Sequence, residues 1–313
     1  MRTSSLLTRP DLAALVERQC GVLTRAQLRA HDVGASAICQ AADAERWSLV
    51  GDRVVLLQTG EPTESQARWI AVLHASDWTT GTAALAAWTA LQADGMHGFE
   101  SRLTHVVVRR GVHVPELPGL KVHESRRLAP ADLHPSRTPP RTRTERSAVD
   151  AAVWSPTVRI ACALVAAVVQ QRLSTADRIR ECLEDAGRVR FRQYLLSVLA
   201  DIQGGAHSLA ELDLGRICHR AGLVPPVRQR VRRDRQGRRR YLDCEWDLPD
   251  GRVVILEVDG AQHMEIEHWW ADMPRQRGIT SWQQMVLRCA AIELRVTPQA
   301  VIDDLRAMGV PRR

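Results

Sequence analysis

The chain has 313 residues and carries 43 basic and 36 acidic side chains, which gives a formal net charge of +7 at pH 7. An apolar fraction of 45% with 25% charged residues is ordinary for a globular protein and excludes a disordered chain. Every basic residue except Lys121 is an arginine. This bias fits either GC-rich codon usage or a phosphate-binding surface, because the guanidinium group matches phosphate oxygens.

The length predicts two or three domains, at about 150 residues per domain. Residues 1–10 hold no apolar block of signal-peptide length, and the longest apolar stretch, residues 160–169, is shorter than the ~20 residues of a membrane helix. The seven cysteines form no C-x-x-C pair, which predicts reduced thiols. We therefore expect a soluble, cytoplasmic protein with no membrane partner.

Residues 1–60 predict three short helices. Apolar side chains at helical spacing place the first helix over 11–19. Thr24 is expected to cap a second helix over 25–30, and Ser36 a third helix over 37–45.

Two strand-like runs follow these helices, on either side of residues 51 and 52. Three helices and a hairpin are the order of a winged helix-turn-helix, whose third helix usually lies in the major groove of DNA. Gln40 and Arg46 are the only DNA-facing candidates on this third helix. An ordinary small helical domain is the alternative.

Residues 61–203 are expected to form a mixed α/β, mostly helical middle domain. No chemical constellation stands out there, so a scaffold or a surface for a protein partner is the expected role. The predicted elements are two helices within 62–93, strands over 104–108 and 120–123, a proline-rich linker over 128–144, and helices up to 202 with one break at Gly187.

Residues 204–313 predict an α/β domain in the order α-β-β-β-α-β-α, after a Gly204-Gly205 hinge. Ser208 is expected to cap its first helix, with Glu211 completing a capping box. The predicted strands and later helices cover 227–233, 238–248, 252–258, 271–283, 285–289 and 298–308.

Three carboxylates converge in this last domain. Pairing Leu248 with Arg252 across the turn sets Asp243 opposite Glu257, and Asp259 shares the face of Glu257 because side chains alternate along a strand. Such an oxygen-rich group suits Mg²⁺ or Mn²⁺. A turn shorter by one residue would instead set Asp243 opposite Val258.

Charge is segregated along the same domain. Residues 228–240 hold eight arginines and one aspartate, whereas residues 243–272 hold nine acids and one arginine. Arginines that hold the phosphate backbone beside a carboxylate site are typical of a metal-dependent nuclease. A solvated basic hairpin followed by acidic turn residues is the alternative. The expected DNA-binding arginines are Arg228, Arg230, Arg232, Arg233, Arg235, Arg238, Arg239 and Arg240.

About 105 residues at the C-terminal end resemble a bacterial domain of unknown function related to the very-short-patch-repair (Vsr) endonuclease, within the PD-(D/E)XK superfamily. The motifs that carry the resemblance are Glu211, Gly222-Leu-Val-Pro-Pro226, Tyr241-Leu-Asp243, Glu257-Val-Asp-Gly260-Ala-Gln-His263, Asp272-x-x-Arg275 and Val286-Leu-Arg288.

This resemblance implies a restriction-endonuclease-like fold. Asp243 and Glu257 would hold the metal, and His263 would be a Vsr-like catalytic histidine that serves as general acid or base. Asp259 stands where the superfamily has a lysine, so the lysine's role in orienting water has no residue assigned to it. The supporting residues implied are Glu211, Asp272 and Arg275.

The first 200 residues are similar to AbiEi-type antitoxin proteins. The similarity lies in Gly21-Val-Leu-Thr-Arg-Ala-Gln27, in residues 47–57 and in Arg143-Thr-Glu-Arg-Ser-Ala-Val-Asp150. It implies transcriptional regulation, or neutralisation of a toxin protein, without catalysis. Two hypotheses follow: a DNA-binding, metal-dependent endonuclease, and a regulator whose nuclease-like domain only binds.

Overall fold

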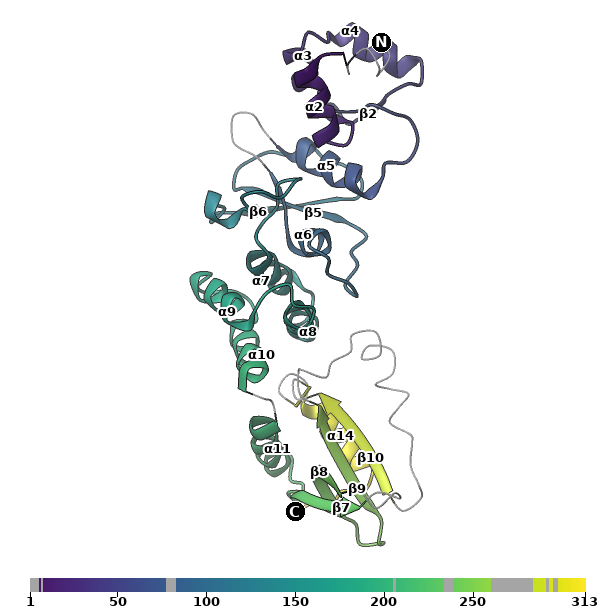
Figure 1. Ribbon diagram of the computed structural model, residues 1–313. Helices are drawn as coiled ribbons and strands as arrows, with labels where there is room; N and C mark the ends of the chain where they lie inside the picture. The colour runs from purple at the N-terminus through teal and green to yellow at the C-terminus, as the bar shows by residue number, and fades with distance from the viewer. Residues whose placement is uncertain are drawn as a thin grey trace. The chain divides into compact units, whose positions relative to one another are not determined.

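A computed structural model describes Leu6 and residues 8–76, 83–204, 207–233, 239–259, 284–290, 293–294 and 298–313 (Figure 1). The chain is mixed α/β, as predicted, and divides into two compact units, Met1–Asp150 and Ala151–Arg313. The domain limits expected near residues 60 and 203 stay predictions. Of the helices described, none is both long and apolar enough to cross a membrane.

The N-terminal part of the first unit combines short helices with a three-stranded antiparallel sheet of order β1-β3-β2. Its buried core includes Leu12, Leu28, Ile38 and Trp47. The predicted helices and hairpin are confirmed, whereas β1 was not predicted. The elements are α2 (Pro10–Arg18), β1 (Val22–Thr24), α3 (Arg25–Ala30), α4 (Ala35–Asp43), β2 (Ser48–Val50) and β3 (Val54–Leu56).

Two helix starts in this part differ in how they are capped. The Thr24 hydroxyl accepts a hydrogen bond from the Gln27 backbone N–H at 3.0 Å, and the Gln27 side chain accepts one from the Thr24 N–H at 2.8 Å. The Thr24 cap is therefore confirmed. The Ser36 cap is wrong, because the extended residue Gly34 is the N-cap of α4 and Ser36 lies inside the helix.

The helix α5 (Glu64–Ala75) packs on the N-terminal sheet. Its Trp69 and Ile70 join a buried cluster with Val22 and Val54 of the strands. The Gln66 side chain donates to the Cys20 carbonyl oxygen at 3.0 Å. This packing brings residues before and after position 60 into one core.

A second three-stranded sheet follows, of order β4-β5-β6, in which β4 pairs antiparallel and β6 parallel to the central strand β5. Val106 and Val108 of β5 are buried against Val72 of α5. The helices and strands predicted within 62–125 are confirmed. The elements of this part, after α5, are β4 (Ala84–Leu85), α6 (Ala87–Ala93), β5 (Thr104–Arg109), β6 (Leu120–Ser125), the 3-10 turn η1 (Pro130–Asp132) and α7 (Thr144–Trp154).

The strands β5 and β6 also bring two histidine rings together. His105 Nδ1 lies 2.9 Å from His123 Nε2, and the Ser101 hydroxyl lies 2.9 Å from His105 Nε2. Burial, with a smaller effect of the Lys121 charge, lowers the pKa of His105 to about 4. Burial, His105 and Lys121 together lower the pKa of His123 to about 3.

The stability of the first unit should therefore fall in acid. Both histidines bind protons less readily when folded than in the unfolded chain, where the pKa is about 6.5, so stability drops as pH falls from about 6.5 toward 4. Lys121→Gln should reduce this drop, because it removes a charge that opposes protonation. Thermal melts between pH 7 and 4 test this, with the exposed His113→Gln as control. If the thermal stability of Lys121→Gln depended on pH in the same way as that of the wild type, the predicted effect of the Lys121 charge would be contradicted.

A buried arginine joins α7 to the loop before it. Arg146 Nε donates to Asp150 Oδ2 at 2.8 Å, Nη1 to Asp132 Oδ1 at 3.1 Å and Nη2 to the Ser125 hydroxyl at 3.1 Å. These bonds use most of the guanidinium donors inside the fold. Arg146 is thus a structural residue of the first unit.

The second unit begins with helices that share an apolar interior, including Leu164, Ile179 and Leu199. The predicted break at Gly187 is confirmed. The prediction of a single break is wrong, because the chain also leaves the helical path near Pro156, which cannot continue a helix, and again before the cap residue Thr175. The helices are α8 (Val158–Gln170), α9 (Ala176–Asp185) and α10 (Arg192–Gly204).

The C-terminal part holds a four-stranded sheet of order β10-β9-β8-β7, antiparallel except for the parallel pair β9 and β10. The predicted strands and last helix are confirmed, and the helix expected over 271–283 lies outside the described residues. Ser208 lies within its helix, so its predicted role as N-cap is wrong. The elements are α11 (His207–Arg220), β7 (Val227–Arg233), β8 (Arg239–Asp247), β9 (Val253–Asp259), β10 (Gln284–Ala290) and α14 (Pro298–Ala307).

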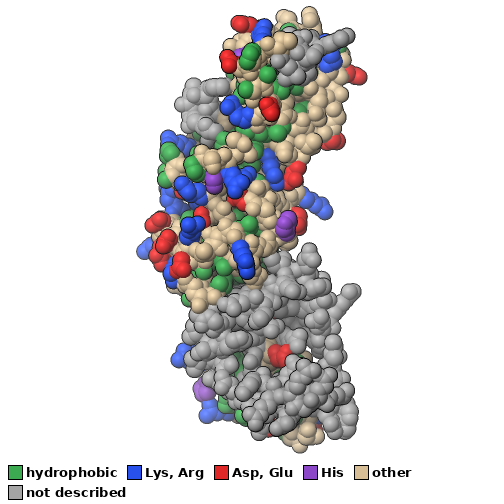
Figure 2. All heavy atoms as spheres, viewed as in Figure 1, with side chains coloured by type: hydrophobic (Ala, Val, Ile, Leu, Met, Phe, Trp, Pro, Cys, Tyr) green, Lys and Arg blue, Asp and Glu red, His purple; other side chains and the backbone are tan. Residues whose placement is uncertain are grey.

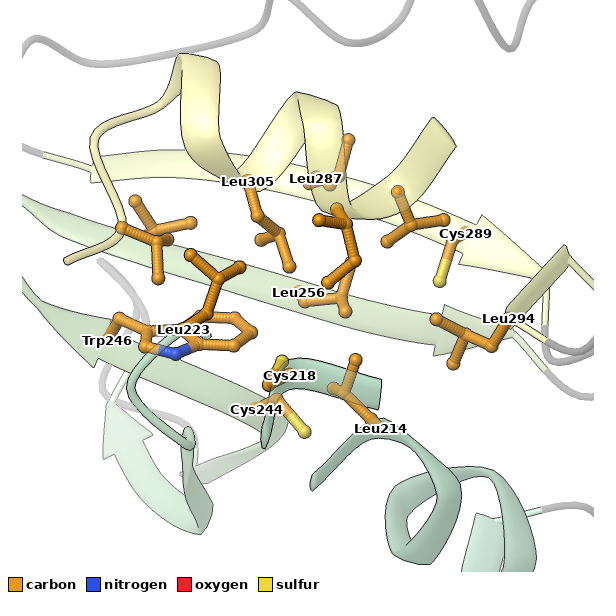
Figure 3. Packing of buried hydrophobic residues seen from close by; sticks show 14 of the residues in the cluster. Leu214, Cys218, Leu223, Cys244, Trp246, Leu256, Leu287, Cys289, Leu294 and Leu305 are labelled. Atoms are coloured by element: carbon orange, nitrogen blue, oxygen red, sulfur yellow. The ribbon is translucent and has the colours of Figure 1, made fainter. Parts of the chain in front are cut away.

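One face of this sheet carries the apolar core of the C-terminal part. Figure 3 shows Leu256 and Leu287 of the strands packed with Leu305 of α14 and with Leu214 and Cys218 of α11. The indole N–H of Trp246 donates to the Val224 carbonyl oxygen at 2.8 Å and fixes the segment after α11 against β8. This packing determines which sheet face is left for a functional site.

Candidate functional site

The predicted register between β8 and β9 is confirmed. Cys244 is the Cα partner of Leu256 and Asp247 that of Val253, and the Leu248 N–H donates to the Arg252 carbonyl oxygen at 2.8 Å. The last Cα pair of this register is Cys244 with Leu256, and continuing it by one residue along both strands would set Asp243 opposite Glu257. The alternative pairing with Val258 is thereby wrong.

The turn between the two strands holds this register. Gly251 has a φ of +81°, a conformation that glycine adopts without strain. The Asp250 carboxylate accepts hydrogen bonds from the Arg252 N–H at 3.1 Å and from Arg252 Nε at 2.6 Å. The backbone bond and then the side-chain bond from Arg252 lower the pKa of Asp250 below its usual range.

The carboxylate positions alternate with the residues of the apolar core. Cys244, Trp246 and Leu256 lie in that core, so positions 243, 245, 257 and 259 belong to the other sheet face. The side chains of Asp243 and Asp259 lie outside those that the structure describes. The alternation along the strands therefore places these four acidic positions on one sheet face, together with Asp247 of β8.

Glu245 is an acidic residue of this face that sequence reasoning missed. Its side chain is 1% exposed, although a buried carboxylate is unfavourable without compensation. Its Cα partners are Val227 on β7 and Ile255 on β9. Its separation of two residues from Asp243 was the available signal, because residues i and i+2 of a strand share a face.

Glu257 is half-buried and has an arginine in register beside it. Its Cα partner on the parallel strand β10 is Arg288, and that of Asp259 is Ala290. The pairing of β9 with β10 thus places an arginine position next to Glu257, the second predicted metal ligand.

The donor set suits a hard divalent cation. As predicted metal ligands, Asp243, Glu257 and Asp259 would supply carboxylate oxygens, which Mg²⁺ and Mn²⁺ prefer. Among the side chains that the structure describes, no three or more His, Cys, Asp or Glu gather as a metal site. The predicted residues His263, Asp272 and Arg275 lie outside the described part, and Glu211 lies in α11 with its side chain outside it.

The arginines of the predicted DNA-binding hairpin divide between the two sheet faces. Arg232 is the Cα partner of Arg240, and Arg233 that of Arg239. The register thus sets two arginines opposite each other at each of these positions, and like charges directly opposite each other destabilise a sheet unless they are neutralised. Arg228 is the partner of the core residue Cys244. It therefore belongs, with positions 230, 232 and 240, to the core-side face, and only positions 233 and 239 share the carboxylate face; Arg235 and Arg238 lie outside the described residues.

The two N-terminal candidates are both on the surface. Gln40 is exposed on α4, and exposed Arg46 donates from Nη2 to the Gln40 carbonyl oxygen at 3.5 Å. Residues 8–76 contain seven basic and eight acidic side chains. The helix is accessible, but its surroundings are not basic.

No protein-family model matches the chain, and no curated protein matches it significantly. Its function is therefore inferred from register, burial and charge.

Proposed function

We propose that the chain is a DNA-binding protein whose C-terminal part is an endonuclease-like domain that hydrolyses phosphodiester bonds with a divalent metal ion. The observation that supports this proposal is the β8–β9 register, which pairs Cys244 with Leu256 and, if continued by one residue along each strand, would bring Asp243 opposite Glu257. Two facing carboxylates are unfavourable unless a cation or a proton neutralises them. A metal ion is the cation that fits oxygen ligands of this kind.

The topology supports the nuclease-like assignment. A helix precedes three antiparallel strands, and a fourth strand returns parallel to the third and is followed by a helix. The parallel return requires a crossover between β9 and β10. This order agrees with the restriction-endonuclease-like core that the resemblance implies.

In this proposal Asp243 and Glu257 would hold Mg²⁺ or Mn²⁺, with Asp259 beside them. A bound ion of this kind supplies charge stabilisation for the phosphoryl transition state and a more acidic water. Among the chain's own residues, His263 would donate or accept the proton. Arg233 and Arg239 are the hairpin arginines best placed by register to hold the phosphate backbone near the carboxylates.

The second candidate is an AbiEi-type regulator that binds DNA, or a toxin protein, without catalysis. The arrangement of α2, α3, α4 and the β2–β3 hairpin favours it, because this is the order of a winged helix-turn-helix. The regulator is also favoured by Asp259, which stands where the PD-(D/E)XK superfamily has a lysine. All seven cysteines are free thiols, which supports a reducing, cytoplasmic location for either candidate.

The test is a nicking assay on supercoiled plasmid with the full chain. The nuclease proposal expects nicking with Mg²⁺ or Mn²⁺ and none in EDTA, with DNA binding under both conditions. DNA binding without nicking by any divalent ion would overturn the nuclease and leave the regulator. For the regulator we expect binding to its own promoter, weakened by Gln40→Ala with Arg46→Ala.

A further inference from the structure

The first unit has an excess of exposed cations in its second half. Residues 100–146 contain ten basic and five acidic side chains, so this stretch supplies five of the seven net charges of the chain. Only Glu100, Glu116 and Glu124 are exposed acids in the stretch. The exposed basic residues are Arg102, Arg109, Arg110, Lys121, Arg126, Arg127, Arg137 and Arg143.

Four of these arginines come together where β5 and β6 end. Arg109 and Arg110 close β5, and Arg126 and Arg127 follow β6. Because the two strands are parallel, both carboxyl ends lie at the same edge of the sheet. Lys and Arg side chains are visible in Figure 2 at the level of β5 and β6. We call these four residues the arginine edge.

Backbone contacts fix the arginine edge in place. Arg109 is the Cα partner of Ser125, the Arg110 N–H donates to the Ser125 carbonyl oxygen at 3.1 Å, and the Arg127 N–H donates to the Ser125 hydroxyl at 3.1 Å. Paired strands lie about 4.8 Å apart. The backbones of the four arginines therefore meet around one residue, Ser125.

Three of the four edge arginines do not serve the fold in the way that the buried arginines do, whereas Arg127 also acts through its charge on the buried carboxylate of Asp150. Arg146 and Arg141 bind Asp132, Asp150 and Asp94 inside the unit. By contrast, Arg109, Arg110 and Arg126 are exposed and form no ion pair with any residue that the structure describes. Glu124 is an exposed acid near the edge, and it accepts a hydrogen bond from the Gly111 N–H at 3.3 Å. The edge keeps an excess of positive charge.

We infer that the arginine edge is a binding surface for the phosphate backbone of double-stranded DNA. DNA carries one negative charge per about 1.7 Å of its axis, so a cluster of this size faces several phosphates at once. The guanidinium group forms paired hydrogen bonds with phosphate oxygens. Sequence is read by contacts to base edges in the DNA grooves, and among the described residues the arginine edge has no helix or strand that would enter a groove, so we expect contacts to phosphates only. The inference rests on the proposed DNA-binding function and assigns its non-specific contacts to the first unit.

The test is fluorescence anisotropy of the full chain with a labelled duplex in EDTA, over a range of salt concentrations. The variants Arg109→Gln/Arg110→Gln and Arg126→Gln/Arg127→Gln each remove two contacts. For each pair we expect the slope of log affinity against log salt to fall by about 2, and affinity at 0.1 M salt to fall on the order of tens-fold. The control Arg172→Gln/Arg188→Gln removes two exposed arginines of the second unit and should bind as wild type does.

The outcomes separate this inference from the nuclease proposal. Reduced slopes without any plasmid nicking would support the arginine edge and remove the nuclease. Nicking with unchanged slopes in both pairs would overturn the arginine edge and leave the nuclease. The arginine edge would also be overturned if the control Arg172→Gln/Arg188→Gln lost as much affinity for the duplex as the edge variants. Binding of the chain to phosphatidylserine vesicles but not to the duplex would overturn it as well. Far-ultraviolet circular dichroism confirms that each variant is folded.

Discussion

Replacing Glu257 by glutamine is expected to lower metal-dependent nicking at least ~100-fold, because even indirect partners of a metal ligand contribute ~10–100-fold. Glutamine keeps the size of the side chain and removes its charge. DNA binding in EDTA should persist or tighten, since a negative charge near the phosphates is gone. Parallel measurement of plasmid nicking and duplex binding checks both effects.

The matched control for this variant is Asp303→Asn. Asp303 loses the same charge but is exposed on α14, where it accepts hydrogen bonds from Gln299 at 2.7 Å and Arg306 at 3.0 Å. It should nick DNA at the wild-type rate. If Glu257→Gln also nicks DNA at the wild-type rate, Glu257 is not a ligand of a catalytic metal ion. The β8–β9 register would then not identify a metal site.

The β8–β9 pair was predictable because its information is local. A Pro-Asp-Gly turn between two apolar runs determines the loop length, and the loop length determines which residues face each other. The pairing of Cys244 with Leu256 follows from this alone. The burial of Glu245 does not, because it depends on packing from distant segments.

Elements whose stability comes from tertiary contacts were not predictable in the same way. The strand β1 has three residues and exists through its antiparallel pairing with β3, some thirty residues later. A run of that length carries no usable periodicity. The start of α4 at Gly34, and not at Ser36, likewise reflects the turn that buries Val33.

The arginine edge shows the same limitation for function. Arg109 and Arg110 are separated in sequence from Arg126 and Arg127 by a connection that includes β6, so no window of the sequence contains them as a cluster. Only the parallel pairing of β5 with β6 brings them to one edge. The hairpin arginines show the opposite case, because a dense run in the sequence divides between two sheet faces.

Replacing Arg146 by methionine is expected to destabilise the first unit by about 3–5 kcal/mol, the usual loss when one partner of a buried ion pair is removed. Asp150 would keep its buried carboxylate without the bond from Arg146 Nε, which measures 2.8 Å. Urea denaturation monitored by circular dichroism measures the loss. Arg126→Met, at an exposed site, should change stability by less than about 0.5 kcal/mol.

The pH dependence of Arg146→Met distinguishes two causes of the destabilisation: a buried Asp150 carboxylate left without its ion-pair partner, and the loss of packing by the alkyl chain of Arg146. Burial already raises the pKa of Asp150 above its usual range, and Arg146 opposes that shift. Without Arg146 the folded pKa rises further above the unfolded value of about 3.9, so stability is retained in acid and declines as pH rises through the folded pKa. The double variant Arg146→Met/Asp150→Leu should recover most of the loss at pH 8, because no charge is left buried. A loss equal at pH 5 and pH 8, or not recovered in the double variant, would mean that Arg146 stabilises the unit through the packing of its alkyl chain.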